Sequence, residues 1–181
     1  MFSTTGTSRL LLSSALLLAL SACGGGSSDA GSGVDTSVFQ GSWTATTNNR
    51  PACFNYNSFG GAYWGSVAPF SIVGNTATYT IKVYSDSGCT NQLGNFAQIY
   101  SVVWALASVP GKSNVAKITT TLTSTSGNGQ GFTLTSPPAL GTVDKGLFYV
   151  SGTSLYTGNT RGTLDADGYP TTLNAAPDYI R

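Results

Sequence analysis

Few residues in this chain have side chains that could support acid–base or nucleophilic chemistry. Histidine and glutamate are absent, so aspartate supplies all 7 acidic side chains. Without histidine, neither a Ser-His-Asp triad nor a Cys-His pair can form, and histidine-based zinc or copper sites are excluded. Serine and threonine are abundant but have no basic partner to activate them. We therefore expect a protein that is not an enzyme and that uses no cofactor.

Two carboxylates lie close together near the C-terminus, in Asp165-Ala166-Asp167-Gly168. This stretch is similar to the start of a calcium-binding loop, but such a loop needs more oxygen ligands and a closing glutamate. Aspartate and glycine in this arrangement are also typical of turns. The sequence therefore predicts a turn here, and we expect no metal.

The segment 53–65 is the most suggestive of ligand binding, because aromatic side chains crowd a loop rich in glycine and asparagine. Aromatic loops at the mouth of a β-barrel can grip an apolar or sugar ligand. The alternative is that these rings cap the end of the barrel and fill its core. The candidate ligand-binding residues are Tyr56, Phe59, Tyr63, Trp64 and, on one side of the predicted strand 98–107, Trp104.

Short alternating segments must position these residues. Segment 76–85 places Tyr79, Ile81 and Val83 on one face and threonine or lysine on the other, as expected for a half-buried strand. The other predicted strands are 39–46, 66–73, 98–107, 114–124, 131–136, 146–151 and 154–158. Turn residues separate them, among them Gly74-Asn75, Pro110-Gly111, Gly127-Asn128-Gly129 and Asp144-Lys145-Gly146.

About eight short strands with hairpin spacing indicate a barrel or a sandwich. Mostly sequential hairpins favour an all-β fold over residues 38–181, an antiparallel up-and-down barrel, with an immunoglobulin-like β-sandwich as the alternative. A transmembrane barrel is disfavoured, because its strands need an apolar lipid-facing side and segment 114–124 offers threonine instead. Pro69, within the predicted strand 66–73, indicates an edge or a bulge.

Gly41-Ser42-Trp43, at the start of the first predicted strand, resembles the G-x-W motif of lipocalins and related calycin barrels. The resemblance implies that Trp43 closes one end of the barrel. The wider layout, with Asp86 to Cys89 at the last cysteine and Asp167-Gly168-Tyr169-Pro170 near the end, is similar to small bacterial lipoproteins. These similarities imply a fold and a cellular address rather than a known activity.

The N-terminus is typical of an export signal. An apolar run from Leu10 to Leu20 follows Arg9, and it is about half the ~20 residues of a membrane-spanning helix. It matches the short core of a secretory signal peptide, over residues 1–22. Leu20-Ser21-Ala22-Cys23 resembles the lipobox of bacterial lipoproteins. That resemblance implies a lipidated Cys23 as the first residue after cleavage, and Gly24 after it implies the outer membrane.

The remaining cysteines agree with export. Lipidated Cys23 would be the first residue of a linker over residues 23–37, which is rich in glycine and serine and is therefore expected to be flexible. The other two cysteines, Cys53 and Cys89, would most simply form a disulfide in an oxidising periplasm. A redox-active pair typically shows a C-x-x-C spacing, which this pair lacks.

Charge limits the partners further. Charged residues make up 8% of the chain, against ~25% in typical domains. Without Arg9 the basic and acidic side chains balance, so nucleic acid is not an expected partner. We expect a non-catalytic domain, attached to the membrane by its lipid and facing the periplasm, that binds a small apolar ligand. The alternative is a structural or interaction lipoprotein that contacts another envelope protein.

The substitution Cys23→Ser should abolish lipidation, because serine lacks the thiol that lipobox processing modifies. Incorporation of a labelled acyl chain into the exported protein measures this. Ser27→Ala, four residues further along the predicted linker, should keep the label. Acyl label that persists on the Cys23→Ser protein would contradict the predicted anchor.

Overall fold

The computed structural model describes residues 33–46, 52–55, 63–129, 132 and 137–181. Within them the chain forms one short 3-10 helix, η1 (Thr36–Phe39), and otherwise strands and turns. The strands are β1 (Gly41–Ala45), β2 (Phe54–Asn55), β3 (Trp64–Val67), β4 (Phe70–Val73), β5 (Thr76–Tyr84), β6 (Gln92–Val109), β7 (Lys112–Gly129), β8 (Val143–Ser151), β9 (Ser154–Thr157) and β10 (Tyr179–Ile180). No helix in the described part is long and apolar enough to cross a bilayer.

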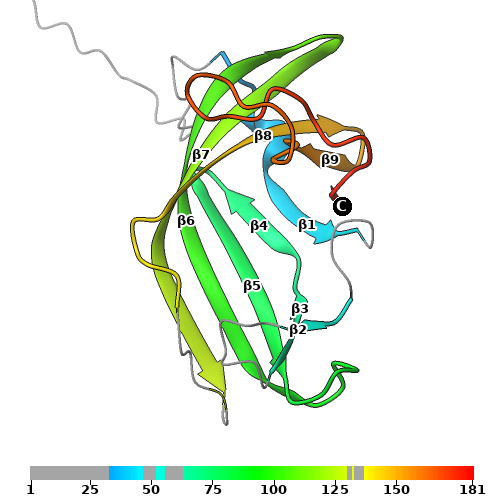
Figure 1. The fold of residues 1–181 in the computed structure, drawn as a ribbon, viewed down its shortest axis with the longest axis vertical. Coiled ribbons are helices and arrows are strands. Elements are labelled where there is room, and N and C mark those ends of the chain that lie inside the picture. The colour runs from blue at the N-terminus through cyan, green and yellow to red at the C-terminus, as the bar shows by residue number, and fades with distance from the viewer. Residues whose placement is uncertain (1–32, 47–51, 56–62, 130–131, 133–136) are drawn as a thin grey trace, which may run out of the picture.

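The strands close into an eight-stranded antiparallel barrel (Figure 1). Strands β4 to β10 each pair with the next in the chain, and β10 pairs with β1, which pairs with β4. The predicted up-and-down barrel is therefore confirmed, and the sandwich alternative is wrong. Strands β2 and β3 extend the sheet beside the lower part of β5.

Local sequence explains most of these elements. The alternation in 76–85 becomes β5, with Ile81 and Val83 fully buried. The predicted hairpins at Gly74-Asn75 and Pro110-Gly111 join β4 to β5 and β6 to β7. Gly74 and Gly111 have φ of 57° and 72°, which glycine adopts without steric strain.

Three features differ from the sequence-based prediction. The predicted strand 66–73 is two strands, β3 and β4, interrupted at Ala68-Pro69 because proline cannot donate to the ladder. The turns predicted at 127–129 and 144–146 lie inside β7 and β8. At the first of these sites glycine serves a close approach: a Cβ on Gly129 would lie 2.3 Å from the carbonyl oxygen of Leu93.

The prediction also missed two short strands. β2 and β10 are each two residues long, too short to show an alternating pattern. The predicted strand 131–136 lies outside the described residues except for Phe132, which is not in a strand. The barrel is completed instead by β10, at the end of the chain.

One end of the barrel is closed by the main hydrophobic core. Trp43 and Phe39 are fully buried there, and the indole Nε1 of Trp43 donates to the Phe39 carbonyl oxygen at 2.9 Å. Phe39 stacks on Trp104 with ring centroids 5.2 Å apart. Arg181 lies over the Trp43 ring at 4.6 Å and donates to the Gln40 carbonyl oxygen. Trp43 therefore lies where the G-x-W resemblance implied, at a closed end.

The last residues of the predicted linker, from Val34 onward, already belong to the folded barrel. Val34 packs against the core, and the Asp35 carboxylate accepts from the backbone N–H of Ser37 at the start of η1. The side chain of Asn114 exchanges hydrogen bonds with the backbone of Asp35. These contacts fasten the N-terminal segment to the β6–β7 hairpin.

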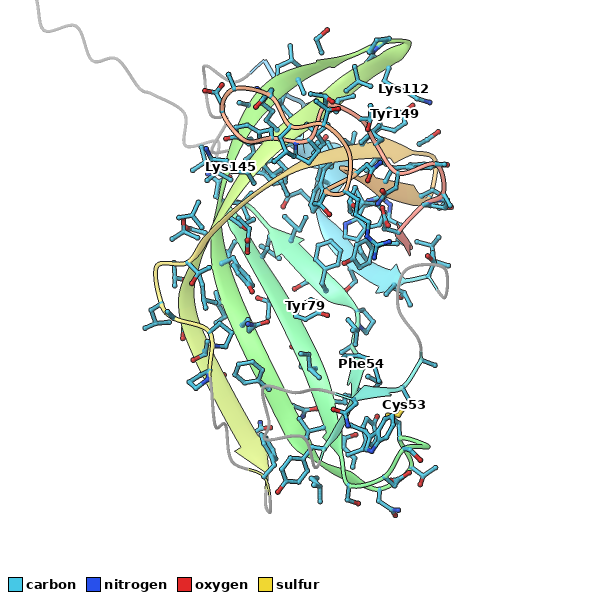
Figure 2. All side chains as sticks on the ribbon, viewed as in Figure 1. Cys53, Phe54, Tyr79, Lys112, Lys145 and Tyr149 are labelled. Atoms are coloured by element: carbon cyan, nitrogen blue, oxygen red, sulfur yellow. A yellow bond between two sulfur atoms is a disulfide. The ribbon has the colours of Figure 1, made fainter. Side chains whose placement is uncertain are left out.

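A smaller core of Ile81, Val83 and Phe96 fills the opposite end. The Cys53–Cys89 disulfide lies at this end, closing a loop between residues 36 positions apart (Figure 2). On the chain-entropy model such a link stabilises the fold by ~3–4 kcal/mol. The Asp86 carboxylate accepts from the backbone N–H groups of Gly88, Thr90 and Asn91 and so shapes the turn that presents Cys89.

We predict that Phe39→Ala lowers the free energy of unfolding by about 3–5 kcal/mol, because it empties the centre of the closed end. Denaturant unfolding followed by tryptophan fluorescence measures the change. Val73→Ala, at a side chain that is 73% exposed, is the control and should change the free energy by less than about 0.5 kcal/mol. Equal effects of the two substitutions would contradict the assigned core.

Candidate functional site

A cavity of about 430 Å³ lies inside the barrel between the two cores. Its lining comes from strands β4 to β10 and comprises Phe70, Ala77, Tyr79, Gln98, Tyr100, Ile118, Thr120, Asp144, Phe148, Thr157 and Tyr179. Tyr79 packs against both cores and lies about midway along the barrel (Figure 2). The cavity exists because side chains fill the two ends of the barrel and leave its middle open.

The unequal lengths of the strands give the cavity its opening. Strands β5, β6 and β7 continue past the level at which β1, β8, β9 and β10 stop (Figure 1). β7 pairs with β8 only from Ala116 to Thr121, although β7 itself runs on to Gly129. All eight strands therefore surround the barrel at its closed end, whereas beyond that level the long strands β5, β6 and β7 form a wall on one side.

Aromatic rings form much of the wall. Phe70 and Tyr179 meet edge to face with ring centroids 4.6 Å apart, and Phe148 lies 6.3 Å from Phe70. Such pairs hold each ring in a fixed orientation. The lining is thus largely apolar and stiff, as is usual for sites that take small organic molecules.

Gln98 is the buried polar side chain of this cavity. It is 6% exposed and stands on β6 directly opposite Tyr79 on β5. Its side-chain amide has no hydrogen-bond partner among the described residues. The amide atoms are not wholly shielded from solvent, so they face the open space of the cavity, where a ligand or water can hydrogen-bond to them.

Asp144 stands at the exposed mouth of the cavity. Its position on β8 is fixed by pairing with Thr120 of β7, whose hydroxyl donates to the Asp144 carbonyl oxygen at 3.5 Å. The neighbouring Lys145 points to the outer surface, where it donates to the Asp167 carbonyl oxygen. Asp144 is the one charged side chain among the described residues that line the cavity.

The ligand-binding residues predicted from sequence lie in three places. Tyr56 and Phe59 fall outside the described residues. Tyr63 is half-buried against the small core, where it meets Phe132 edge to face. Trp64 is half-buried on β3, paired with Tyr84 of β5. Trp104 belongs to the closed end, with its Nε1 donating to Asn75. None of Tyr63, Trp64 and Trp104 is among the described residues that line the cavity inside the barrel.

Gln98, Tyr100 and Asp144 line the cavity but were not predicted as ligand-binding residues from the sequence. Gln98 and Tyr100 share a face of the predicted strand 98–107, and this shared face was the signal that could have marked them. Asp144 was assigned to a turn because Asp-Lys-Gly is typical of turns. Only the sheet register shows that it occupies an inward position of β8.

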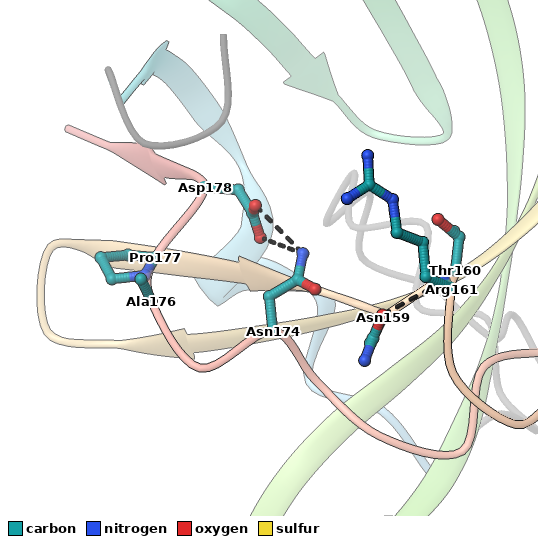
Figure 3. Close-up of a pocket in the computed structure, with 7 residues that line it drawn as sticks. All are labelled: Asn159, Thr160, Arg161, Asn174, Ala176, Pro177 and Asp178. Atoms are coloured by element: carbon teal, nitrogen blue, oxygen red, sulfur yellow. Dashed lines mark hydrogen bonds between the residues drawn. The ribbon is translucent and has the colours of Figure 1, made fainter.

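A second hollow, of about 450 Å³, lies outside the barrel near the C-terminal tail (Figure 3). Its buried acid, Asp178, accepts from the backbone N–H and hydroxyl of Thr157 at 2.7 and 2.8 Å and from the side-chain amide of Asn174. These bonds tie the tail to β9. The polar residues of this hollow therefore have a structural role, which is to hold β10 in place.

The aspartates predicted to lie in a C-terminal turn do so. Asp165 accepts from the backbone N–H groups of Asp167 and Tyr169, and its carboxylate lies 2.6 Å from the Lys117 ammonium. The hydrogen bond from Lys117 is the main cause that lowers the pKa of Asp165, and the same bond raises the pKa of Lys117. A cation would have to displace Lys117, and the described residues contain no cluster suited to a metal ion.

The fold and cavity define an up-and-down β-barrel with an internal, aromatic-walled cavity. No protein-family model matches the chain, and neither curated proteins nor solved structures gave a match. Its function must therefore be inferred from its own geometry.

Gln98→Leu should raise the free energy of unfolding of the ligand-free protein by about 1 kcal/mol, because it replaces an amide that has no protein partner with an apolar side chain in a mainly apolar cavity. Gln40→Leu is the matched control. Gln40 bonds to the backbone of Gly74, so the same substitution there should lower the free energy by about 1–2 kcal/mol. Thermal or denaturant unfolding measures both, and destabilisation by Gln98→Leu would contradict the assignment.

Proposed function

We propose that this protein is a non-catalytic binding protein that holds a small, mainly apolar molecule in the cavity of its barrel. The observation that carries the proposal is the Gln98 side chain, 6% exposed, whose amide lines an aromatic-walled cavity and has no hydrogen-bond partner among the described residues. A cavity meant only for packing would be filled by side chains, since protein interiors are close-packed. An apolar ligand with one hydrogen-bonding group would pack against the rings and bond to the Gln98 amide.

The size of the cavity supports the same proposal. Its volume of about 430 Å³ lies within the ~300–1,000 Å³ of typical small-molecule sites. The rings that line it are braced by one another, and so the site is largely formed before a ligand enters. A preformed site loses less conformational entropy on binding.

We further propose that the protein acts at the cell envelope, anchored through lipidated Cys23 in the outer membrane and facing the periplasm. Leu20-Ser21-Ala22-Cys23 and the short apolar run before it support this address. The Cys53–Cys89 disulfide fits an oxidising compartment. The glycine- and serine-rich segment predicted as a linker, residues 23–37, would hold the barrel ~20 Å from its anchor, close enough to exchange apolar molecules with a membrane.

A role in protein interaction is the alternative, and the outer edge of β6 favours it. From Val102 to Val109, β6 pairs among the described strands only with β7, because its pairing with β5 stops at Ser101. Val103 and Leu106 are exposed along this stretch. An apolar strand edge can add a strand from another protein, and such a partner would leave the cavity unused.

The substitution Ala77→Phe tests the proposed cavity, because it places a ring inside the barrel. Titration of the exported protein with the neutral fluorescent probe N-phenyl-1-naphthylamine should show binding that Ala77→Phe weakens by roughly tenfold or more. Thr78→Phe adds the same ring to the opposite face of β5 and should leave binding unchanged.

Folding of each variant is checked by its circular dichroism spectrum. Probe binding by Ala77→Phe at the strength of the unchanged protein would contradict the cavity as the site. Failure of the unchanged protein to bind would favour the interaction role.

A further inference from the structure

We propose that the cavity selects its ligands by charge, taking neutral and cationic apolar molecules, amines above all, and rejecting apolar carboxylates. This inference rests on the proposed function and names the ligand class for the same site. The ammonium group would lie at the mouth beside the Asp144 carboxylate, and the apolar body would lie among the rings inside.

The cavity contains no compensating positive charge among its described lining residues. The basic side chains nearby are engaged elsewhere. Lys112 lies over Tyr149, Lys117 pairs with Asp165, Lys145 contacts Asp167 and Tyr169, and Arg181 covers Trp43. Among the described lining residues, the one charge that an anionic headgroup would meet at this mouth is the like charge of Asp144, which is unfavourable.

The Asp144 carboxylate makes no hydrogen bond or ion pair with any residue that the structure describes. Four of the other described acids, Asp35, Asp86, Asp165 and Asp178, accept from neighbouring donors, and Asp167 lies 3.9 Å from the Lys117 ammonium. Those four have structural partners, whereas Asp144 is presented at a cavity mouth with its backbone fixed by β7. The one carboxylate of the lining is thus available to a ligand.

The aromatic lining acts in the same direction. The cavity with Asp144 at its mouth is lined by five aromatic side chains, Phe70, Tyr79, Tyr100, Phe148 and Tyr179. The face of an aromatic ring attracts a cation and repels an anion, and rings grouped around a site are the usual means of binding organic ammonium ions. Ring walls and a mouth carboxylate together favour an apolar amine, while Gln98 leaves neutral hydrogen-bonding molecules acceptable.

Three probes of equal chain length, decylamine, decanol and decanoate, separate the effect of headgroup charge from that of the apolar chain. The affinity of each is measured by its displacement of N-phenyl-1-naphthylamine from the exported protein. We expect decylamine to bind roughly tenfold more tightly than decanoate at low salt. In Asp144→Asn that ratio should fall to about twofold, with decanol unchanged. Comparing variants under identical conditions removes any difference in how the probes partition into lipid.

Asp167→Asn is the matched control, because it removes the same charge from the outer surface and should leave the ratio unchanged. If decanol binds but decylamine shows no advantage over decanoate, or if Asp144→Asn leaves the ratio intact, the charge selection is overturned and the binding function stands. If none of the three displaces the probe, or the probe itself does not bind, the proposed function is overturned as well.

Discussion

Closure of the barrel between its first and last strands is the constraint on which the rest of the structure depends. β10 is two residues long and meets β1 in only two register pairs, Thr44 with Ile180 and Ala45 with Tyr179. Backbone pairing this short is weak by itself. Side chains around β10 stabilise its pairing with β1. Asp178 ties the tail to Thr157, and Arg181 covers the Trp43 ring and donates to the Gln40 carbonyl oxygen.

The same closure builds the site. When β10 docks, it brings Tyr179 against Phe70 and so completes the aromatic wall of the cavity. The long strands β5, β6 and β7 pass the point where the short strands end, which leaves the cavity open on one side. A fully packed closed end, a disulfide-linked far end and an unfilled middle therefore follow from one arrangement of long and short strands.

Much of the fold could be predicted from the sequence, because alternation and turn chemistry are local signals. The pattern of Tyr79, Ile81 and Val83 gave β5, and the two hairpin turns beside it and after β6 were correctly placed. β10 could not be found in this way, since two residues carry no periodicity and its pairing depends on strands far away in the chain.

The site was less predictable than the fold for a related reason. The sequence drew attention to the aromatic residues of segment 53–65 and to Trp104, but Tyr63 packs against the small core and Trp104 into the closed end. The chemistry of the cavity comes from Gln98 and Asp144, whose importance depends on burial and register. A glutamine in a strand is ordinary until its side chain is known to line a cavity, and Asp144 resembles a turn residue until β8 is aligned with β7.

Native mass spectrometry of the gently purified, exported protein tests the central claim most directly, that the cavity holds a small molecule. The account predicts a stoichiometric added mass that is released on denaturation, is absent from the Ala77→Phe protein and corresponds to a neutral or amine-bearing compound. If each protein shows only the mass of its own bare chain, and neither retains added decylamine, the result would contradict this claim.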